Sequence, residues 1–181
     1  MRTFKLCLLS LAVVVAGTLM GCSPSTKSPD VAASIRTSLD QAGLKDVTVS
    51  QDRDKGVVTL SGHVAADADK SQAETIAKSF AGTQVVADQI AVLPQGGESQ
   101  AKAVNSDLDK GIESNLDAAL IQAKLHKSVS YSVKNNVVTL TGEVNSEAKR
   151  AQAEQVATAV PNVQQVVNEL QVKGQKATSS N

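Results

Sequence analysis

The sequence repeats itself at a spacing of 80 residues, and this repeat constrains the fold more than any other feature. The segment VVTLSGHV at Val57–Val64 returns as VVTLTGEV at Val137–Val144. Apolar positions that follow each segment also match in register. The repeat aligns Ala73 with Ala153, Ile76 with Val156, Phe80 with Val160, Val86 with Val166, Ile90 with Leu170, and Val92 with Val172. Each copy is long enough for a compact core of its own, so the repeat predicts two small domains of one kind and not a solenoid.

Hydrophobic periodicity predicts the same order of elements in each copy. In the first copy, apolar residues recur at helical spacing in 30–42 and 67–81, and they alternate as in half-buried strands in 47–50 and 57–64. A third strand is expected over 84–93. Because the second helix is a crossover, the third strand should run parallel to the second, while the first two strands form an antiparallel hairpin. Each helix carries one apolar stripe, which favours both helices on one face of the sheet and solvent on the other.

The predicted fold class is therefore α+β, with two αββαβ domains that each hold a three-stranded mixed sheet and two helices on one face. Helix starts are expected where short polar side chains precede the apolar stripes. Asp30 and Asp67 are the expected N-caps in the first copy, and Asn145 or Ser146 is the expected N-cap of the last helix. The first helix of the second copy is expected to start within 106–112.

Two kinds of residue interrupt the apolar faces of the strands. Gly62 and Gly142 stand where a side chain would project towards the covering helices, so we interpret them as structural glycines that permit a close helix–sheet approach or a bulge. Asp88 and Asn168 occupy the inward face of the third strands. A short polar side chain in such a place is expected to bond to nearby backbone and not to a ligand.

The composition limits both the cores and the functions. Hydrophobic residues make up 41% of the chain but aromatic residues only 2%, so the cores are aliphatic, small and marginally stable. An apolar stripe of Ala73, Ile76, Ala77 and Phe80 is expected in the second helix. The scarcity of aromatic rings argues against platforms that stack bases or sugars. The first copy holds six basic and nine acidic side chains and the second holds eight of each, so neither shows the basic excess of a nucleic-acid binder.

The beginning of the chain is typical of a secretory signal. Arg2 and Lys5 precede an apolar run of about 15 residues, which is shorter than the roughly 20 that a membrane-spanning helix needs. The run ends in LMGC at 19–22, which resembles the lipobox of bacterial lipoproteins. The resemblance implies cleavage before Cys22 and firm anchoring through several acyl chains on this residue. Ser23, in place of the aspartate that retains lipoproteins in the inner membrane, implies the outer membrane. The alternative is an ordinary secreted protein with a chance cysteine.

Composition shifts divide the chain into segments. Residues after Cys22 are polar and proline-containing, so they cannot bury apolar surface and are expected to form a tether of at most about 25 Å. A Pro- and Gly-containing stretch separates the two copies. The expected segments are a signal peptide over 1–21, a tether over 22–29, a first domain over 30–93, a linker over 94–104, a second domain over 105–173 and a disordered tail over 174–181.

The repeated strands resemble those of the BON-domain family. The segments 58–64 and 138–144 match the family's Val-x-Leu-x-Gly-x-Val strand, and 166–172 matches its closing Val-x-Asn-x-Leu-x-Val strand. The first copy departs from the closing pattern at Asp88 and Ile90. Two copies behind a lipobox resemble the dual BON-domain outer-membrane lipoproteins. The resemblance implies αββαβ domains, a link to the bacterial envelope, osmotic stress and phospholipid surfaces, and no catalytic residues.

No arrangement of side chains predicts catalysis or a metal site. His63 and His126 are the only histidines, they lie in different copies, and no spacing typical of zinc ligands occurs. His63 is expected on the solvent face of its strand. The sequence DRDKG at 52–56 resembles the start of a calcium loop but lacks the later ligands, so a charged hairpin turn is favoured. We therefore expect no enzyme, no cofactor and no metal.

The best candidate for phospholipid contact lies at the end of the first helix of the second copy. Lys124, His126 and Lys127 cluster there beside Leu125. Basic groups near an anionic membrane surface contribute about 1 kcal/mol each. A second basic pair, at 149–150, is a weaker candidate, and both groups of cations could serve only to keep the surface hydrated.

The sequence thus predicts a non-enzymatic envelope lipoprotein at the periplasmic face of the outer membrane. Its BON domains would bind phospholipid surfaces and support membrane integrity under stress. One alternative is a protein-interaction module whose exposed sheet faces dock an envelope partner, with membrane contact only through Cys22. Another is the binding of a small ion or solute, for which the sequence locates no site.

Overall fold

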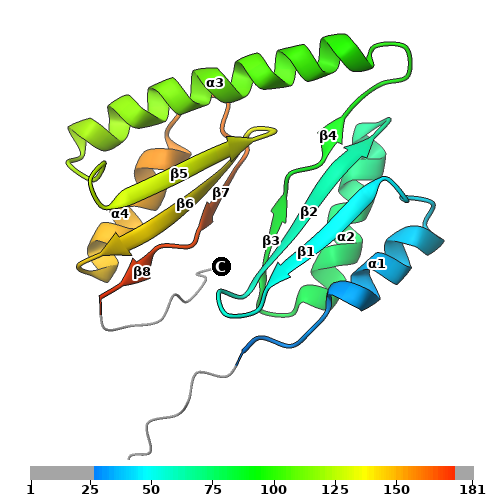
Figure 1. Ribbon diagram of the computed structural model, residues 1–181, viewed down its shortest axis with the longest axis horizontal. Helices are drawn as coiled ribbons and strands as arrows, with labels where there is room; N and C mark the ends of the chain where they lie inside the picture. The colour runs from blue at the N-terminus through cyan, green and yellow to red at the C-terminus, as the bar shows by residue number, and fades with distance from the viewer. Residues whose placement is uncertain (1–26, 174–181) are drawn as a thin grey trace, which may run out of the picture.

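The computed structural model describes residues 27–173 and contains two αββαβ units in succession (Figure 1). The predicted α+β class with two mixed sheets is confirmed. The signal peptide, Cys22 and the tail over 174–181 lie outside the described residues. The first unit comprises α1 (Ala32–Gln41), β1 (Val47–Asp52), β2 (Val57–Val64), α2 (Asp67–Ala81), β3 (Val85–Asp88) and β4 (Ala91–Val92). The second comprises α3 (Glu98–Gln122), β5 (Val129–Lys134), β6 (Val137–Val144), α4 (Glu147–Thr158), β7 (Gln165–Asn168) and β8 (Gln171–Val172).

Each sheet has the predicted hairpin and crossover, but the expected third strand is broken in two. β2 pairs antiparallel with β1 and parallel with both β3 and β4, and β6 pairs in the same way with β5, β7 and β8. At the break, Asp88 Oδ1 accepts the N–H of Ile90 at 3.1 Å, and Asn168 Oδ1 accepts that of Leu170 at 3.2 Å. These side chains bond to nearby backbone, as predicted, and satisfy an N–H group where the strand is interrupted.

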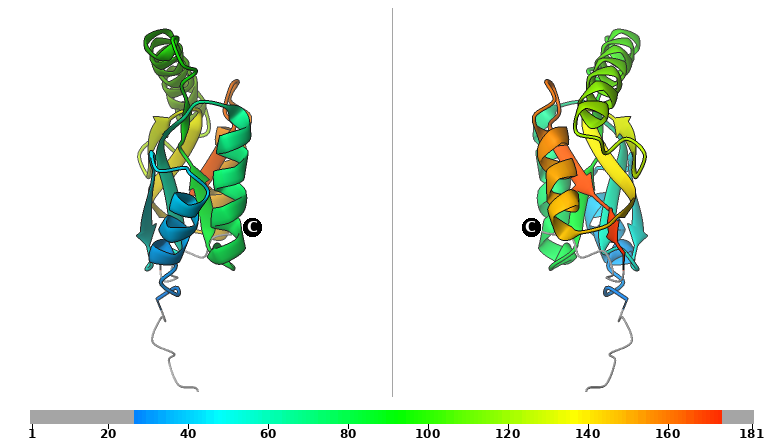
Figure 2. Two further views of the ribbon diagram at one scale, coloured as in Figure 1. Left: turned by 90° about the vertical axis from the view of Figure 1, so that its right-hand side faces the viewer. Right: turned by 90° about the vertical axis from the view of Figure 1, so that its left-hand side faces the viewer.

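The helices cover one face of each sheet, with α1 and α2 on the first and α3 and α4 on the second (Figures 1 and 2). Buried alanines at every fourth position bring α2 close to its sheet, namely Ala73, Ala77 and Ala81. The prediction that Phe80 belongs to this stripe is wrong, because its side chain is 40% exposed. Phe80 lies one residue, or about 100° around the helix, from Ala81. Burial of the small alanine therefore turns the phenyl ring towards solvent.

Helix α3 begins at Glu98 and takes up most of the expected linker. The prediction of a start within 106–112 is wrong. The first half of α3 has no buried stripe, and Val104 within it is 57% exposed, so apolar periodicity gave no signal for this part. The Ala- and Lys-containing sequence still favours a helix through its intrinsic propensity. The result is one continuous helix that runs past both sheets at one end of the molecule (Figures 1 and 2).

The predicted caps are confirmed at one of three helix starts. Ser146 is the N-cap of α4, and its hydroxyl accepts the N–H of Lys149 at 3.3 Å. The prediction for Asp67 is wrong, because it is the first helical residue of α2, where its charge suits the positive end of the helix dipole. Asp30 also does not cap α1. Val31 takes that position, and its N–H donates to Gln51 Oε1 of β1 at 3.1 Å.

Gly62 and Gly142 hold equivalent places in β2 and β6 with φ angles of +102° and +119°. A Cβ atom on Gly62 would lie 2.0 Å from the carbonyl oxygen of Asp46, and one on Gly142 would lie 2.4 Å from that of Ser128. The close approach is therefore to the backbone that enters the neighbouring strand, and not to the helices as expected. Both the positive φ angle and the lack of space require glycine.

The outer faces of the two sheets meet where β3 and β7 lie side by side. Val57 and Ala87 of the first sheet pack with Val137 and Val167 of the second, and all four are buried. The prediction that this face lies in solvent is therefore wrong for these strands. The apolar residues at outward positions bury more surface by packing the domains together than by facing water.

The contacts across this domain junction are reciprocal. Lys55 Nζ, in the first hairpin, donates to Glu169 Oε2 of the second domain. The repeat makes Asn135 the equivalent of Lys55 and Gln89 the equivalent of Glu169, and Asn135 Nδ2 donates to the Gln89 carbonyl oxygen at 2.8 Å. Reciprocal contacts between equivalent positions are the mark of a two-fold interface. The two domains of one chain thus meet as the subunits of a symmetric dimer do.

Candidate functional site

The basic loop that follows α3 is exposed, as a membrane-contact site requires. Lys124, His126 and Lys127 all lie on the surface. Lys124 adopts a φ angle of +57°, which turns the chain sharply at the helix end. Leu125 is 1% exposed and belongs to the core of the second domain. The prediction that Leu125 contacts lipid is therefore wrong, because its side chain is already buried beneath the loop.

Ile121 supplies the exposed apolar side chain that Leu125 does not. It lies in the last turn of α3, three residues before Lys124, and is 51% exposed. The sequence does carry a signal for the exposure of this residue. Leu120 and Ile121 are adjacent, and an amphipathic helix that buries one of two neighbours exposes the other. We refer to Ile121, Lys124, His126 and Lys127 as the basic patch. The nearest acid on α3 is Asp117, one turn before Ile121.

The weaker basic candidate, Lys149–Arg150, does not form a second patch of this kind. Lys149 is exposed, but Arg150 is 5% exposed. Its guanidinium donates to the carbonyl oxygen of Asn168 at 3.4 Å and lies 3.6 Å from a carboxylate oxygen of Glu147. Arg150 therefore serves the packing of α4 on β7 and is not available to a headgroup.

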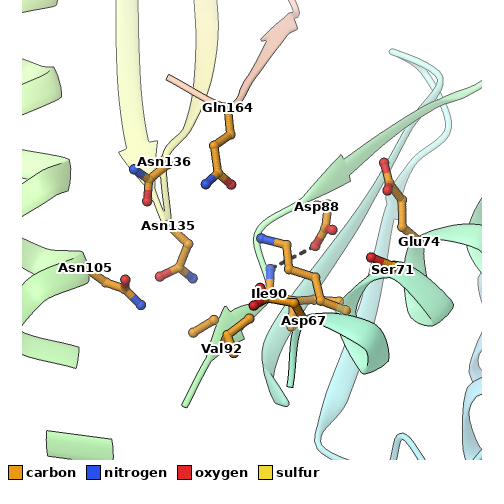
Figure 3. Close-up of a pocket in the computed structure, with 12 residues that line it drawn as sticks. Asp67, Ser71, Glu74, Asp88, Ile90, Val92, Asn105, Asn135, Asn136 and Gln164 are labelled. Atoms are coloured by element: carbon orange, nitrogen blue, oxygen red, sulfur yellow. Dashed lines mark hydrogen bonds between the residues drawn. The ribbon is translucent and has the colours of Figure 1, made fainter. Parts of the chain in front are cut away.

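A cavity of about 320 Å³ lies at the domain junction, between α2, the break after β3, α3 and the β5–β6 turn (Figure 3). The first domain contributes carboxylates and one ammonium group, from Asp67, Glu74, Asp88 and Lys70. The second domain contributes side-chain amides, from Asn105, Asn135, Asn136 and Gln164. An adjoining cavity of about 240 Å³ shares Lys70, Glu74, Asp88 and Gln164. Sequence patterns do not indicate this site, because its two halves lie in different domains.

The far wall of the cavity is held in place by Asp109 of α3. Its carboxylate oxygens accept the N–H groups of Asn135 at 2.9 Å and Asn136 at 2.8 Å. Both asparagines have positive φ angles, +48° and +65°, which suit a tight hairpin turn and which Asn tolerates. Asn136 Nδ2 also donates to the Asn162 carbonyl oxygen at 3.0 Å. The β5–β6 turn is therefore held rigidly to α3 and to the loop at Asn162 by hydrogen bonds within the second domain.

Two ionisable groups at the junction are perturbed by their surroundings. Burial raises the pKa of Asp88, and the nearby Glu74 carboxylate adds to this, while Lys70, the N–H of Ile90 and Lys78 oppose it. The hydrogen bond to Glu169 raises the pKa of Lys55 against the opposing effect of partial burial. Ion pairs and burial that serve only the fold commonly cause pKa shifts of this kind. Asp88 also lines the cavity, however, and a carboxylate with a perturbed pKa in a cavity is a candidate binding group.

The described residues show no further sign of metal or membrane-spanning chemistry. Within 27–173, no group of three or more His, Cys, Asp or Glu side chains is placed to hold a metal ion. No helix in this part of the chain is long and apolar enough to cross a bilayer. His63 is exposed, as predicted. In the first hairpin, Asp52 Oδ1 accepts the N–H groups of Asp54 and Lys55, both at 3.0 Å, which is the arrangement of a charged turn.

Comparisons with known proteins agree with the repeat. The BON domain matches residues 27–94 and again 108–174. Osmotically-inducible protein Y of Escherichia coli (strain K12) is 32% identical over 145 residues, which cover 79% of this chain and 71% of that protein. Two solved structures of CdsD, a structural protein of the type III secretion system of Chlamydia trachomatis, show 17% and 16% identity with TM-scores of 0.36 and 0.33. They cover 76% and 81% of this chain, and 90% and 99% of theirs, and similarity this low carries no argument about function. The chain belongs to the BON-domain family and carries two copies of the domain in tandem.

Proposed function

We propose that this protein is a non-enzymatic, stress-related envelope lipoprotein that is anchored through Cys22 and contacts anionic phospholipid through the basic patch. The observation that carries the proposal is the exposed Ile121 in the last turn of α3, which leads directly into a loop with the exposed Lys124, His126 and Lys127. An apolar side chain that enters the headgroup region, flanked by cations that meet anionic lipid, is the usual chemistry of peripheral membrane contact. The similarity to an osmotically inducible protein supports the link to stress.

The lipid contact is tested by co-sedimentation with liposomes. The mature chain without its acyl anchor, residues 23–181, should bind vesicles that contain phosphatidylglycerol and not vesicles of phosphatidylcholine. Neutralising Lys124 and Lys127 together to Gln removes about 2 kcal/mol, or roughly thirtyfold in partitioning, at about 1 kcal/mol for each lysine. Ile121→Ser should also weaken binding, because it removes the apolar contact.

Matched controls come from the same helix and the same domain. Val104→Ser alters an equally exposed apolar residue of α3 that lies 17 residues, or about 25 Å, before Ile121. Lys149→Gln removes an exposed lysine outside the basic patch. Both should leave binding unchanged. Equal and negligible binding to the two kinds of vesicle, or an effect of Val104→Ser as large as that of Ile121→Ser, would remove the proposal.

The anchor is tested separately by cell fractionation. The wild-type protein should remain with the membrane fraction, and Cys22→Ser should shift away from the position of a processed, acylated lipoprotein. Unacylated wild-type protein in the soluble periplasm would contradict the anchor without affecting the lipid contact of the basic patch.

The outer sheet faces that could dock a protein partner are smaller than the sequence implied. The outer faces of β3 and β7 are occupied by the domain junction. What remains on β1 and β5 is small and polar, with exposed Thr48, Ser50, Ser130 and Ser132. We therefore favour lipid over a protein partner. Crosslinks from these four positions to an envelope protein, insensitive to changes at Lys124 and Lys127, would favour the partner.

A further inference from the structure

The repeat provides an internal comparison for the cavity at the domain junction. Asp88, Glu74 and Lys70 of the first domain correspond to Asn168, Glu154 and Arg150 of the second. The fold places both sets alike, at the first break of the third strand and on the helix that crosses over it. Differences between the two sets therefore arise from the side chains and not from the backbone.

In the second domain, hydrogen bonds within this group of residues satisfy the side chains of Asn168 and Glu154. Asn168 Nδ2 donates to Glu154 Oε2 at 2.9 Å and to the Arg150 carbonyl oxygen at 3.3 Å, while Oδ1 accepts the N–H of Leu170. The amide thus supplies an N–H donor to the carboxylate and an acceptor to the backbone. Arg150 fills the space beside them and is almost fully buried.

In the first domain the donor is missing. Asp88 Oδ1 keeps the equivalent backbone bond to Ile90, but an ionised carboxylate has no N–H to offer Glu74. Asp88 as a whole residue is 7% exposed, and its Oδ2, which is not fully shielded from solvent, accepts no hydrogen bond from any residue within 27–173. Glu74 pairs with Lys78 along the helix at 2.7 Å. Within the described residues no ion pair joins Lys70 to Asp88 or Glu74, although the Lys70 charge opposes the rise in the pKa of Asp88. Asp88 Oδ2 is therefore an acceptor that is open to the cavity.

The lining of the cavity defines what can fill that gap. The lining carries three carboxylates and the ammonium group of Lys70, and Glu74 is also paired with Lys78, so one net negative charge remains and the site favours a positive charge. The amides on the opposite wall, Asn105, Asn135 and Gln164 among them, can accept N–H groups through their oxygen atoms (Figure 3). A volume of about 320 Å³ suits a small molecule and greatly exceeds one dehydrated ion.

We propose that this cavity binds a small organic cation with N–H donors, of the alkylammonium or guanidinium class, which gives Asp88 and Glu74 the hydrogen bonds that Asn168 gives Glu154. The ligand contacts α2 and β3 on one side and α3 and the β5–β6 turn on the other. Binding therefore stabilises the junction between the domains. The site is separate from the basic patch, and its occupancy does not depend on membrane contact.

The proposal is tested by isothermal titration of the full-length protein in non-ionic detergent micelles with 1,4-diaminobutane as the probe. The wild type should bind one equivalent in a saturable manner. The bis-quaternary hexamethyl analogue has the same charge but no N–H group, and it should bind at least tenfold more weakly. Sodium and potassium chloride at equal ionic strength should not compete beyond the effect of screening.

The decisive variant is Asp88→Asn, which installs the amide that the second domain already uses at this position. This variant should fold, and its new amide should donate a hydrogen bond to the Glu74 carboxylate. Its affinity for the diamine should fall at least tenfold. Glu74→Gln should weaken binding as well. Asp40→Asn makes the same change in charge on the exposed face of α1, away from the cavity, and should bind as the wild type does. Absence of saturable binding to the wild type, equal binding by Asp88→Asn, or equal binding of the bis-quaternary analogue would each overturn the proposal.

Discussion

The side-chain amide of Gln165 occupies the free edge of β3 at Asp88. Its Oε1 accepts the N–H of Asp88 at 2.9 Å, and its Nε2 donates to the carbonyl oxygen of Val86 at 2.7 Å. These are the backbone groups that a further strand would pair with. One side chain of the second domain thus continues the hydrogen bonding of the first sheet and protects an edge that would otherwise be open.

Gln165→Ala should loosen the junction. Two hydrogen bonds to half-buried backbone groups are lost, which we expect to lower the free energy of unfolding by about 1–3 kcal/mol. Amide hydrogen exchange at Asp88 should speed up, because its N–H loses its partner. Gln164→Ala, at the exposed neighbouring position, is the control and should leave exchange at Asp88 unchanged. Unaltered protection in Gln165→Ala would show that the amide does not hold the edge.

Asp88→Asn should change the dependence of stability on pH. Burial raises the pKa of Asp88 in the folded state, with Glu74 adding to the shift and Lys70 and Lys78 opposing it. The wild type therefore gains stability as pH falls through the folded-state pKa towards the ordinary value of 3.8, and it lacks this gain at neutral pH. Asp88→Asn should be the more stable protein at pH 7, and its advantage should shrink as the solution is acidified.

The measurement is denaturant unfolding of both proteins between about pH 4 and pH 7. Asp40→Asn controls for the change in net charge, since Asp40 lies exposed on α1. A stability difference between Asp88→Asn and wild type that grows on acidification has the wrong sign and would refute the assignment.

Val137→Asp should separate the domains without unfolding them. Val137 is buried in the cluster between the two sheets, outside the core that the second domain forms with its own helices. A charge placed there has no partner and is expected to move into water by opening the junction. Small-angle scattering should show a larger radius of gyration with little change in far-ultraviolet circular dichroism. Ser132→Asp adds the same charge at an exposed position of β5 and should leave the scattering curve as it is. Complete unfolding of Val137→Asp would show that the domains depend on each other.

Gly62→Ala and Gly142→Ala should each destabilise the protein by about 1–3 kcal/mol, the cost of a non-glycine residue in a sparsely populated backbone region. The new Cβ would also lie 2.0 Å or 2.4 Å from a carbonyl oxygen, so a strand must shift. Gly111→Ala is the control, because Gly111 lies within α3 with no atom in reach of an added Cβ. It should be neutral or stabilise the protein by up to about 1 kcal/mol, since Ala is the better helix former. Chemical denaturation distinguishes the two outcomes.

The sequence by itself determined the two domains, their fold class and their internal topology. These follow from local patterns: the repeated Val-rich strand, the period of the helical stripes, and Gly62 and Gly142 at equivalent places. It also marked Lys124 and Lys127 as exposed, because charged side chains are seldom buried. Such features depend on neighbours close in sequence, so they can be found without coordinates.

Only the tertiary structure decided how the domains meet and what their meeting creates. Strand alternation places Val57 and Val137 on the outer face of their sheets. It does not show whether that face is covered by solvent or by another sheet. Leu125 follows the end of α3, and only the packing of the loop that contains it shows that its side chain is buried in the core of the second domain. The cavity around Asp88 combines side chains more than 40 positions apart, from Asp88 to Asn135. Periodicity reports which face of an element is apolar, but the partner of that face is fixed by the packing of the whole chain.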